Sequence, residues 1–244
     1  MWNPHSFLFE VFWCVSVYWM VTAYEIVPVV LERFPFPRLV HFLHAAALPI
    51  VFLGITLSTM HHSSLGSLFM VSPTRLHPLW FSLFIPVQFF TSAMGAGLAT
   101  IVLAVIAYGW LYNKKPNLPV LEGLAKASAL LLLVYIAIRF ADLTLMGGGR
   151  WSYVFGENQG WESGLFMAEV LLQVFIPAFI FLVPGLRKNL PVLTAGAASA
   201  FIGLTMHRLD VGFIGYFRDA GTVYIPTLSE FALSLGVLAA AGLV

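Results

Sequence analysis

Long apolar runs dominate this sequence and limit the folds that are open to it. A helix needs roughly 20 apolar residues to cross the hydrocarbon core of a bilayer, and seven stretches of the chain reach that length. We place them at Phe7 to Val30, Arg38 to Thr59, Leu79 to Tyr112, Leu118 to Leu145, Trp161 to Val183, Val192 to Phe213 and Val223 to Val244. The sequence therefore predicts an all-α, polytopic bundle of about seven membrane-spanning helices, forming a single integral membrane domain over residues 1–244.

Composition excludes several classes of protein. Apolar residues make up 60% of the chain and charged residues 9%, against about 45–50% and about 25% in soluble domains. The net charge of +1 gives no basic face for nucleic acid. The single cysteine, Cys14, cannot by itself ligate an iron–sulfur cluster, build a cysteine zinc site or form an internal disulfide. We therefore predict no metal site, and any iron–sulfur cluster must belong to a partner subunit.

The loops indicate an orientation. The third run is too long for one upright helix, so we expect a tilted or interfacial part ending near Pro86, followed by one span. Basic residues then fall on two sides, with six on one (Arg33, Arg38, Lys114, Lys115, Arg187 and Lys188) and three on the other (Arg75, Arg150 and Arg218). The six favour a cytoplasmic side, which leaves the N-terminus and the loops 61–78 and 146–160 outside. Both ends of the sequence suggest truncation, because the last apolar run reaches Val244 without a charged flank.

Ionisable residues within apolar runs are the strongest candidates for function, because a charge in a bilayer must be paired, face water or do chemistry. A larger group falls toward the predicted outer side: Glu10, His61, His62, Arg75, His77, Arg139, Asp142, Glu169, His207, Arg208, Asp210 and Glu230. A smaller group falls toward the inner side: Glu25, His41, His44, Glu122 and Lys126.

Two outer pairs have helical spacing. Arg139 and Asp142 are three residues apart, as are His207 and Asp210, so each pair shares one helix face. A carboxylate beside a guanidinium or imidazole can pass a proton to a bound molecule, or it can simply hold two helices together.

The histidines leave several alternatives open. His61 and His62, followed by Ser-Ser-Leu-Gly-Ser, indicate a polar turn that either hydrogen-bonds a ligand carbonyl or is a solvated loop. His41 and His44 share a face near the depth of Glu25, as a proton-conducting cluster or a packing contact would. A bis-imidazole haem needs histidines on two facing helices, which the inner half lacks but which His207 with His61 or His62 would supply outside.

A resemblance to a known family rests on two stretches. Residues His44 to Phe69, HAAALPIVFLGITLSTMHHSSLGSLF, are followed by His77-Pro78-Leu79-Trp80, and the second stretch is Tyr224-Ile-Pro-Thr-Leu-Ser-Glu230. Both resemble the NrfD-type polysulfide reductase membrane subunits, above all the branch called the b-type cytochrome subunit of nickel–iron hydrogenases.

This resemblance implies a membrane anchor that exchanges electrons between a quinone (menaquinone or ubiquinone) and an iron–sulfur subunit on the outer face, beside a catalytic subunit. It implies no haem, a bacterial or archaeal inner membrane, and proton-path residues in the bundle. Members of the family are typically longer than this chain.

Our leading hypothesis is a quinone-reactive subunit of a respiratory oxidoreductase. We predict that His62 and Asp142 bind the quinone oxygens and take part in the proton step, with Arg139 holding Asp142 ionised. His61, His207, Asp210 and Glu230 would shape the site or relay protons, and Glu25, His41 and His44 would lead to the cytoplasmic side. The alternatives are a proton- or ion-translocating bundle without redox chemistry and a haem b anchor.

Overall fold

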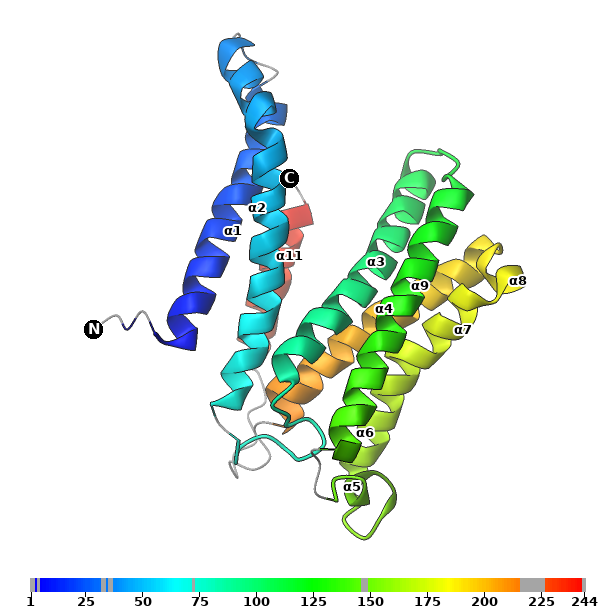
Figure 1. Ribbon diagram of the computed structural model, residues 1–244. Coiled ribbons are helices and arrows are strands. Elements are labelled where there is room, and N and C mark those ends of the chain that lie inside the picture. Colours follow the sequence, from blue (N-terminus) through cyan, green and yellow to red (C-terminus); the bar gives the residue numbers. More distant parts are fainter. Residues whose placement is uncertain are drawn as a thin grey trace.

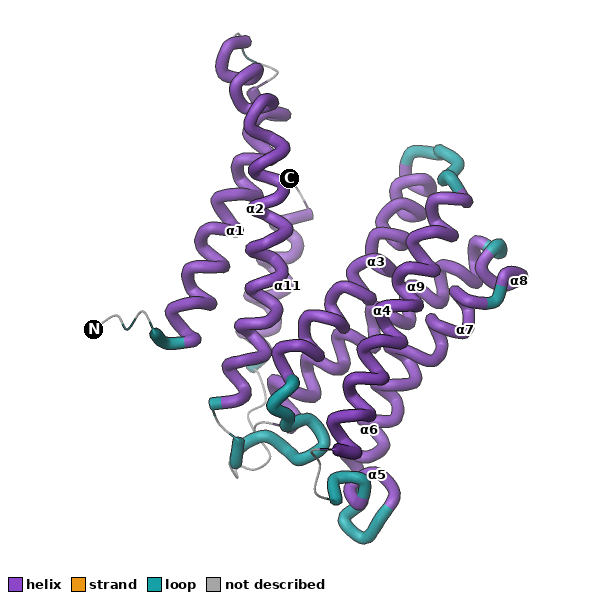
Figure 2. Tube along the Cα trace, viewed as in Figure 1, coloured by secondary structure: helices purple, strands orange, loops and turns teal. Residues whose placement is uncertain are grey.

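The computed structural model describes residues 3, 5–31, 34, 37–71, 73–145, 149–215 and 227–242. Helices account for most of this part of the chain (Figures 1 and 2). The long helices are α1 (Phe7–Leu31), α2 (Pro37–Met70), α3 (Ile85–Leu111), α4 (Leu118–Leu145), α6 (Trp161–Val170), α9 (Leu190–Leu209) and α11 (Leu228–Gly242). The short ones are α5 (Ser152–Phe155), η1 (Leu171–Phe175), α7 (Ile176–Leu182), α8 (Pro184–Arg187) and η2 (Asp210–Ile214).

Six helical segments are long and apolar enough to cross a membrane, and they coincide with the first six predicted passes. They span Leu8–Pro28, Leu39–Met70, Ile85–Leu111, Leu118–Leu145, Trp161–Leu182 and Leu190–Ile214. The seventh predicted pass coincides with α11, whose 15 residues are fewer than the roughly 20 that a full crossing needs. The rest of that pass, 223–226 and 243–244, lies outside the described residues. The all-α polytopic architecture is confirmed.

The helices form a hairpin and a bundle (Figure 1). α1 packs along α2 in the hairpin, and α2 also packs along α3, which belongs to the bundle with α4, α6, α7 and α9. Small residues allow the bundle helices to approach closely: the side chain of Leu132 leaves no room for a Cβ at Gly95. The hydroxyl of Ser128 donates to the carbonyl of Gly95 at 2.7 Å, so polar groups in the apolar core are satisfied across helices.

The second pass is longer than its apolar run. We expected a polar turn at His61 and a loop from there to Pro78, but α2 continues to Met70, so the prediction of a turn was wrong. The hydroxyls in this stretch are satisfied in the helix, since Ser67 donates to the carbonyl of Ser63 at 3.2 Å and Ser64 to the carboxylate of Glu10 at 2.6 Å. The third span begins at Ile85, next to the predicted boundary at Pro86. The interfacial position of the segment before it stays a prediction.

Two π-helical turns interrupt the last two bundle passes. The first, η1, lies just before Pro177, whose missing N–H removes the α-helical hydrogen bond to residue 173. The second, η2, begins at Asp210. Such turns are rare and often lie at functional sites, and both of these lie close to ionisable side chains.

One end of the bundle carries the segment 71–84, α5 and the ends of α4 and η2. We refer to it as the α5 end (lower part of Figure 1). The segment 71–84 is tied to η2, since the backbone N–H of His77 donates to the carbonyl of Gly215 at 3.0 Å. The indole of Trp80, only 1% exposed, anchors the segment in the core. These two contacts hold the segment against the bundle beside the candidate site.

Candidate functional site

A cavity of about 320 Å³ opens at the α5 end. Its volume lies within the range of small-molecule sites. Asp142 and Arg150 supply its charged groups and Ser82 a hydroxyl, and the other lining residues are apolar: Pro73, Leu76, Pro78, Phe81 and Leu83. An apolar wall with a few polar groups is typical of a site for an aromatic ligand.

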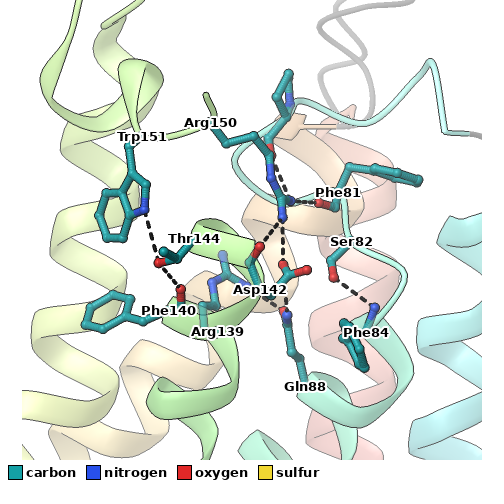
Figure 3. Close-up of polar contacts among 11 residues, drawn as sticks. Phe81, Ser82, Phe84, Gln88, Arg139, Phe140, Asp142, Thr144, Arg150 and Trp151 are labelled. Atoms are coloured by element: carbon teal, nitrogen blue, oxygen red, sulfur yellow. Dashed lines mark hydrogen bonds and ion pairs between the residues drawn. The ribbon is translucent and has the colours of Figure 1, made fainter. Parts of the chain in front are cut away.

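Arg150 joins the end of α4 to the segment 71–84 (Figure 3). Its Nη2 donates to Oδ2 of Asp142 at 2.9 Å and to the backbone carbonyl of Asp142 at 3.0 Å. Its Nη1 donates to the carbonyls of Phe81 and Pro78. Because Asp142 is only 5% exposed, this ion pair gives the carboxylate the partner that burial requires.

The predicted pairing of Arg139 with Asp142 is indirect. Gln88 of α3 lies between them: its Nε2 donates to Oδ2 of Asp142 at 3.4 Å, and its Oε1 accepts from Nη1 of Arg139 at 3.2 Å. Asp142 makes its ion pair with Arg150, and Arg139 makes its own with Glu169 of α6. The expectation that Arg139 directly holds Asp142 ionised is therefore corrected, because Arg150, in the turn before α5, pairs with Asp142, and Glu169 of α6 pairs with Arg139.

A second group of charges, which we call the core cluster, consists of Arg139, Glu169, His207 and Trp80. Oε1 of Glu169 lies 2.9 Å from Nδ1 of His207 and 3.7 Å from Nη2 of Arg139. Oε2 accepts a hydrogen bond from the indole of Trp80 at 2.9 Å. All four side chains are at most 2% exposed, so the cluster joins three helices and segment 71–84 in the bundle interior.

The second predicted pair is also replaced. His207 pairs with Glu169 rather than with Asp210, and Asp210, buried as the first residue of η2, faces Glu169 as well. Glu169 of α6 is therefore the partner of both Arg139 and His207. The spacing along one helix had suggested Asp142 and Asp210 instead.

The adjacent histidines His61 and His62 of α2 lie apart from the Asp142 cavity. His61 and His62 are half-buried with ring centroids 5.8 Å apart, and neither is among the described residues that line that cavity. The structure thus does not bring His62 and Asp142 into one described cavity.

The three residues predicted to lead to the cytoplasmic side do not all line one groove within the described part of the chain. Glu25 lines a groove of about 370 Å³ between the hairpin and α3, together with Tyr18, Val21, Thr22, Val51, Gly54, Ile55, Ser58, Thr59, Phe90 and Met94. His41 and His44 are exposed near the start of α2 and are not among the described residues of that groove. The predicted path that joins all three residues therefore stays a prediction.

Glu230 has a local contact at the start of α11. Its Oε2 accepts a hydrogen bond from the backbone N–H of Thr227 at 2.7 Å. A Thr followed three residues later by a Glu that bonds back to it is the pattern of a capping box. The predicted role of Glu230 at the quinone site stays a prediction.

Sequence reasoning gave no site role to Trp80, Gln88, Arg150, Glu169 or Arg208. A signal existed for Glu169, since a lone carboxylate in an apolar pass needs a buried partner. Trp80 also stands in the stretch His77-Pro78-Leu79-Trp80, on which the family resemblance partly rests. That position was a signal by which a role for Trp80 could have been predicted.

The ring of His207 packs edge-on against Phe89 and Tyr135, with centroids 5.5 and 6.0 Å away, and its Nδ1 faces Glu169. Its Nε2 is buried and makes no hydrogen bond within the described part of the chain. The expectation that this chain carries no haem stays a prediction. Among the described residues, there is also no group of three or more His, Cys, Asp or Glu that could hold a metal ion.

Comparisons with known proteins give the following matches. The family model for polysulphide reductase, NrfD, matches residues 1–218. The chain is 30% identical over 240 residues to the probable Ni/Fe-hydrogenase 2 b-type cytochrome subunit of Escherichia coli (strain K12), covering 97% of this chain and 60% of that relative. It is 28% identical over 272 residues to the menaquinone reductase integral membrane subunit of Nitratidesulfovibrio vulgaris, covering 99% and 63%. The chain spans about three fifths of the length of these relatives.

Proposed function

Because this chain belongs to the NrfD family, and is thus a multi-pass integral membrane protein, we propose that it is the quinone-interacting membrane subunit of a respiratory oxidoreductase complex. In this proposal it exchanges electrons between the membrane quinone pool and an iron–sulfur partner subunit on the outer face, which serves a catalytic subunit. A relative named as a membrane subunit of menaquinone reductase supports the quinone, and one named as a hydrogenase subunit supports a redox complex. The proposed location is a bacterial or archaeal inner membrane.

The observation that carries the proposal is the buried Asp142 carboxylate in the wall of an apolar cavity. A quinol ring would lie among Leu76, Phe81 and Leu83, with one hydroxyl toward Asp142. In this proposal Asp142 is a quinone ligand, and residues of the segment 71–84 supply most of the apolar wall.

The proposed reaction is the oxidation of a quinol, which releases two electrons and two protons. The electrons pass to the cluster of the partner subunit. The Asp142 carboxylate accepts one proton, because it is the anionic group in the cavity wall and lies beside the ring hydroxyl, and the second proton passes to water at the opening of the cavity. Arg150 pairs with the Asp142 carboxylate and holds it in the cavity wall. In quinone reduction, the same groups return protons to the ring.

We propose that any coupled proton movement uses the core cluster. Glu169 and His207 are acid–base groups in contact with each other, and intramembrane groups of this kind typically mark proton pathways. Arg139 connects them to Asp142 through Gln88. A change of charge at the cavity would therefore change the electrostatic potential at the cluster.

The test is turnover of a quinol analogue by the purified complex, followed through reduction of the partner's iron–sulfur cluster. We expect Asp142→Asn and His62→Ala each to abolish quinol-dependent reduction while the subunits still copurify. Glu157→Gln, at an exposed acidic position of the 146–160 loop, is the matched control and should turn over normally. Full turnover in both Asp142→Asn and His62→Ala would refute the assignment.

One alternative function has an observation in its favour. Within the described residues, the core cluster is connected to the cavity lining by Gln88, which bonds both Arg139 and Asp142, and by Trp80, which stands in segment 71–84. A charged cluster that is set apart from the cavity in this way would suit a proton- or ion-translocating bundle without redox chemistry. Such a bundle should neither bind a quinol analogue nor respond to quinone-site inhibitors. A haem b anchor would instead give a Soret band assignable to this chain.

A further inference from the structure

A groove of about 540 Å³ runs along one side of the α1–α2 hairpin. The lining residues that matter here are Phe9, Glu10, Trp13, Val17, Leu57 and Met60. Those of α1 recur at helical spacing over two turns, so the groove follows the helix axis for roughly 12 Å. None of its described lining residues is shared with the Asp142 cavity. The groove is therefore a long, separate feature of the hairpin.

The register of the hairpin places the two walls of the groove at the same depth. α1 and α2 lie side by side and run antiparallel (Figure 1). The hydroxyl of Ser64 donates to Oε1 of Glu10 at 2.6 Å, and a Cβ at Gly54 would lie 3.1 Å from Cγ1 of Val21. Between these two contacts, residues 57–60 of α2 lie level with the middle of the α1 wall.

Polarity falls from one end of the groove to the other. Ser6, just before α1, lies at one end with Glu10, and Val17 and Leu57 lie at the other. The apolar span of α1 covers Leu8–Pro28, so the polar end lies at the level of a membrane interface and the apolar end within the hydrocarbon region. A molecule with a polar head and an apolar tail matches this gradient.

The carboxylate of Glu10 sets the charge of the polar end. Its Oε1 accepts the hydrogen bond from Ser64, and none of the ion pairs among the described residues includes Glu10. A carboxylate at the edge of a membrane span needs a cation or water beside it. A positively charged head is therefore the electrostatic complement of this groove.

Aromatic rings line the groove beside this carboxylate. The rings of Phe9 and Trp13 pack edge to face, with centroids 6.2 Å apart and an interplanar angle of 67°. Trp13 is 49% exposed and Met60 44%, so the groove is open on the side on which membrane lipid would lie. A cation is attracted to the face of an aromatic ring, and tryptophan binds it best. The polar end thus combines a negative charge with an aromatic surface.

We propose that this groove binds an aminophospholipid, phosphatidylethanolamine, with the ammonium group at Glu10 and Trp13 and an acyl chain along Val17 and Leu57. A primary ammonium donates hydrogen bonds to a carboxylate, and such charge-assisted bonds are stronger than neutral ones. Phosphatidylcholine has a cation but no N–H, and phosphatidylglycerol has no cation, so the groove should distinguish the three headgroups. Because Glu10 also accepts from Ser64, the bound lipid would help to hold α1 against α2. The inference does not depend on the proposed quinone chemistry.

The experiment uses the purified complex in nanodiscs that contain one of these three phospholipids, each with a photoreactive group on an acyl chain. After illumination, labelled peptides are identified by mass spectrometry. We expect phosphatidylethanolamine to label the peptides of Val17 and Leu57 roughly tenfold more than phosphatidylglycerol does, as suits a charged hydrogen bond, with phosphatidylcholine between them. Equal labelling by phosphatidylethanolamine and phosphatidylglycerol would overturn the inference without any variant. Labelling by none of the three would show that another protein segment fills the groove, and would also overturn it.

Two variants and two matched controls test the residues. Glu10→Gln keeps the size but removes the charge, and should lower phosphatidylethanolamine labelling roughly tenfold, to the level of phosphatidylglycerol. Trp13→Leu should lower the labelling by phosphatidylethanolamine and phosphatidylcholine by roughly two- to fivefold. Glu157→Gln, at an exposed position outside the groove, and Trp19→Leu, at a 73% exposed position of α1 outside the lining, should change nothing. An unchanged headgroup preference in Glu10→Gln would refute the proposed site.

Discussion

The indole nitrogen of Trp80 donates to Oε2 of Glu169 at 2.9 Å, across 89 positions of sequence. This bond ties the segment at the α5 end to a carboxylate that has no exposure to solvent. The wall of the cavity and the core cluster are therefore mechanically connected, and changes at one should be measurable at the other.

Trp80→Phe should destabilise the protein by about 1–3 kcal/mol, because Glu169 loses a buried donor that nothing else replaces. Thermal denaturation of the purified protein in detergent measures the change. Trp110→Phe is the matched control, since that indole is 84% exposed at the end of α3, and it should shift stability by no more than about 0.5 kcal/mol. Equal melting shifts for the two variants would contradict the role of the Trp80 bond.

The Arg139–Glu169 pair should show strong coupling. Glu169→Leu alone leaves the guanidinium of Arg139 buried without its anion and should cost about 3–5 kcal/mol. Adding Arg139→Met should recover a large part of that loss, because an apolar pair replaces a broken ionic one. The free energies of unfolding of the two single variants and the double variant close the cycle. Simple additivity would show that the two side chains do not depend on each other.

Arg150→Lys keeps the charge but not the planar set of donors, so it should loosen the segment 71–84 while retaining an attraction to Asp142. We expect faster amide hydrogen exchange at residues 76–82 and little change in α7 or α9. Arg75→Lys, at an exposed position of the same segment, should exchange as the unmodified protein does. Unaltered exchange in Arg150→Lys would mean that its carbonyl bonds do not hold the segment.

Gly203→Ala should be severely destabilising, because a Cβ there would collide with the backbone N and Cα of Gln173 in η1. Backbone cannot move aside as a side chain can, so we expect at least about 1–3 kcal/mol. Gly97→Ala is the internal comparison: no described atom lies within 4 Å of its Cβ position, and it should be neutral or stabilising by up to about 1 kcal/mol. Denaturation midpoints of both variants decide this, and a harmless Gly203→Ala would show that α9 and η1 can separate at low cost.

The helices were predictable from the sequence, whereas their partners were not. The run from Leu118 to Leu145 is long and apolar enough to predict a membrane-spanning helix without any other information, and α4 covers the same residues. The pairing of Arg139 with Asp142 looked equally local, but Gln88 of α3 lies between them, Arg139 pairs with Glu169 of α6, and Asp142 pairs with Arg150, which follows the end of α4. Helix rotation and neighbour choice depend on the whole bundle, which spacing within one helix does not encode.

The extent of α2 shows a second limit. His61 to Ser64 is polar enough to indicate a turn, yet the helix continues because Ser64 reaches Glu10 on α1 and Gly66 fits against Pro86 on α3. Both contacts come from other helices, so no local pattern could reveal them. The grouping of charged residues, by contrast, followed from their position in each run, and Asp142 of the predicted outer group lines the cavity at the α5 end.

Each π turn contains one more residue than the α-helical turn that it replaces. Deleting one residue between 171 and 175 would therefore let this turn close as an ordinary α-helical turn, and Glu169 would stay near the face that meets His207. A deletion in a regular α-helical turn of the same pass would instead rotate the flanking helix faces relative to each other by about 100°. The π turn is thus the place at which this pass can change its length while its buried faces stay aligned.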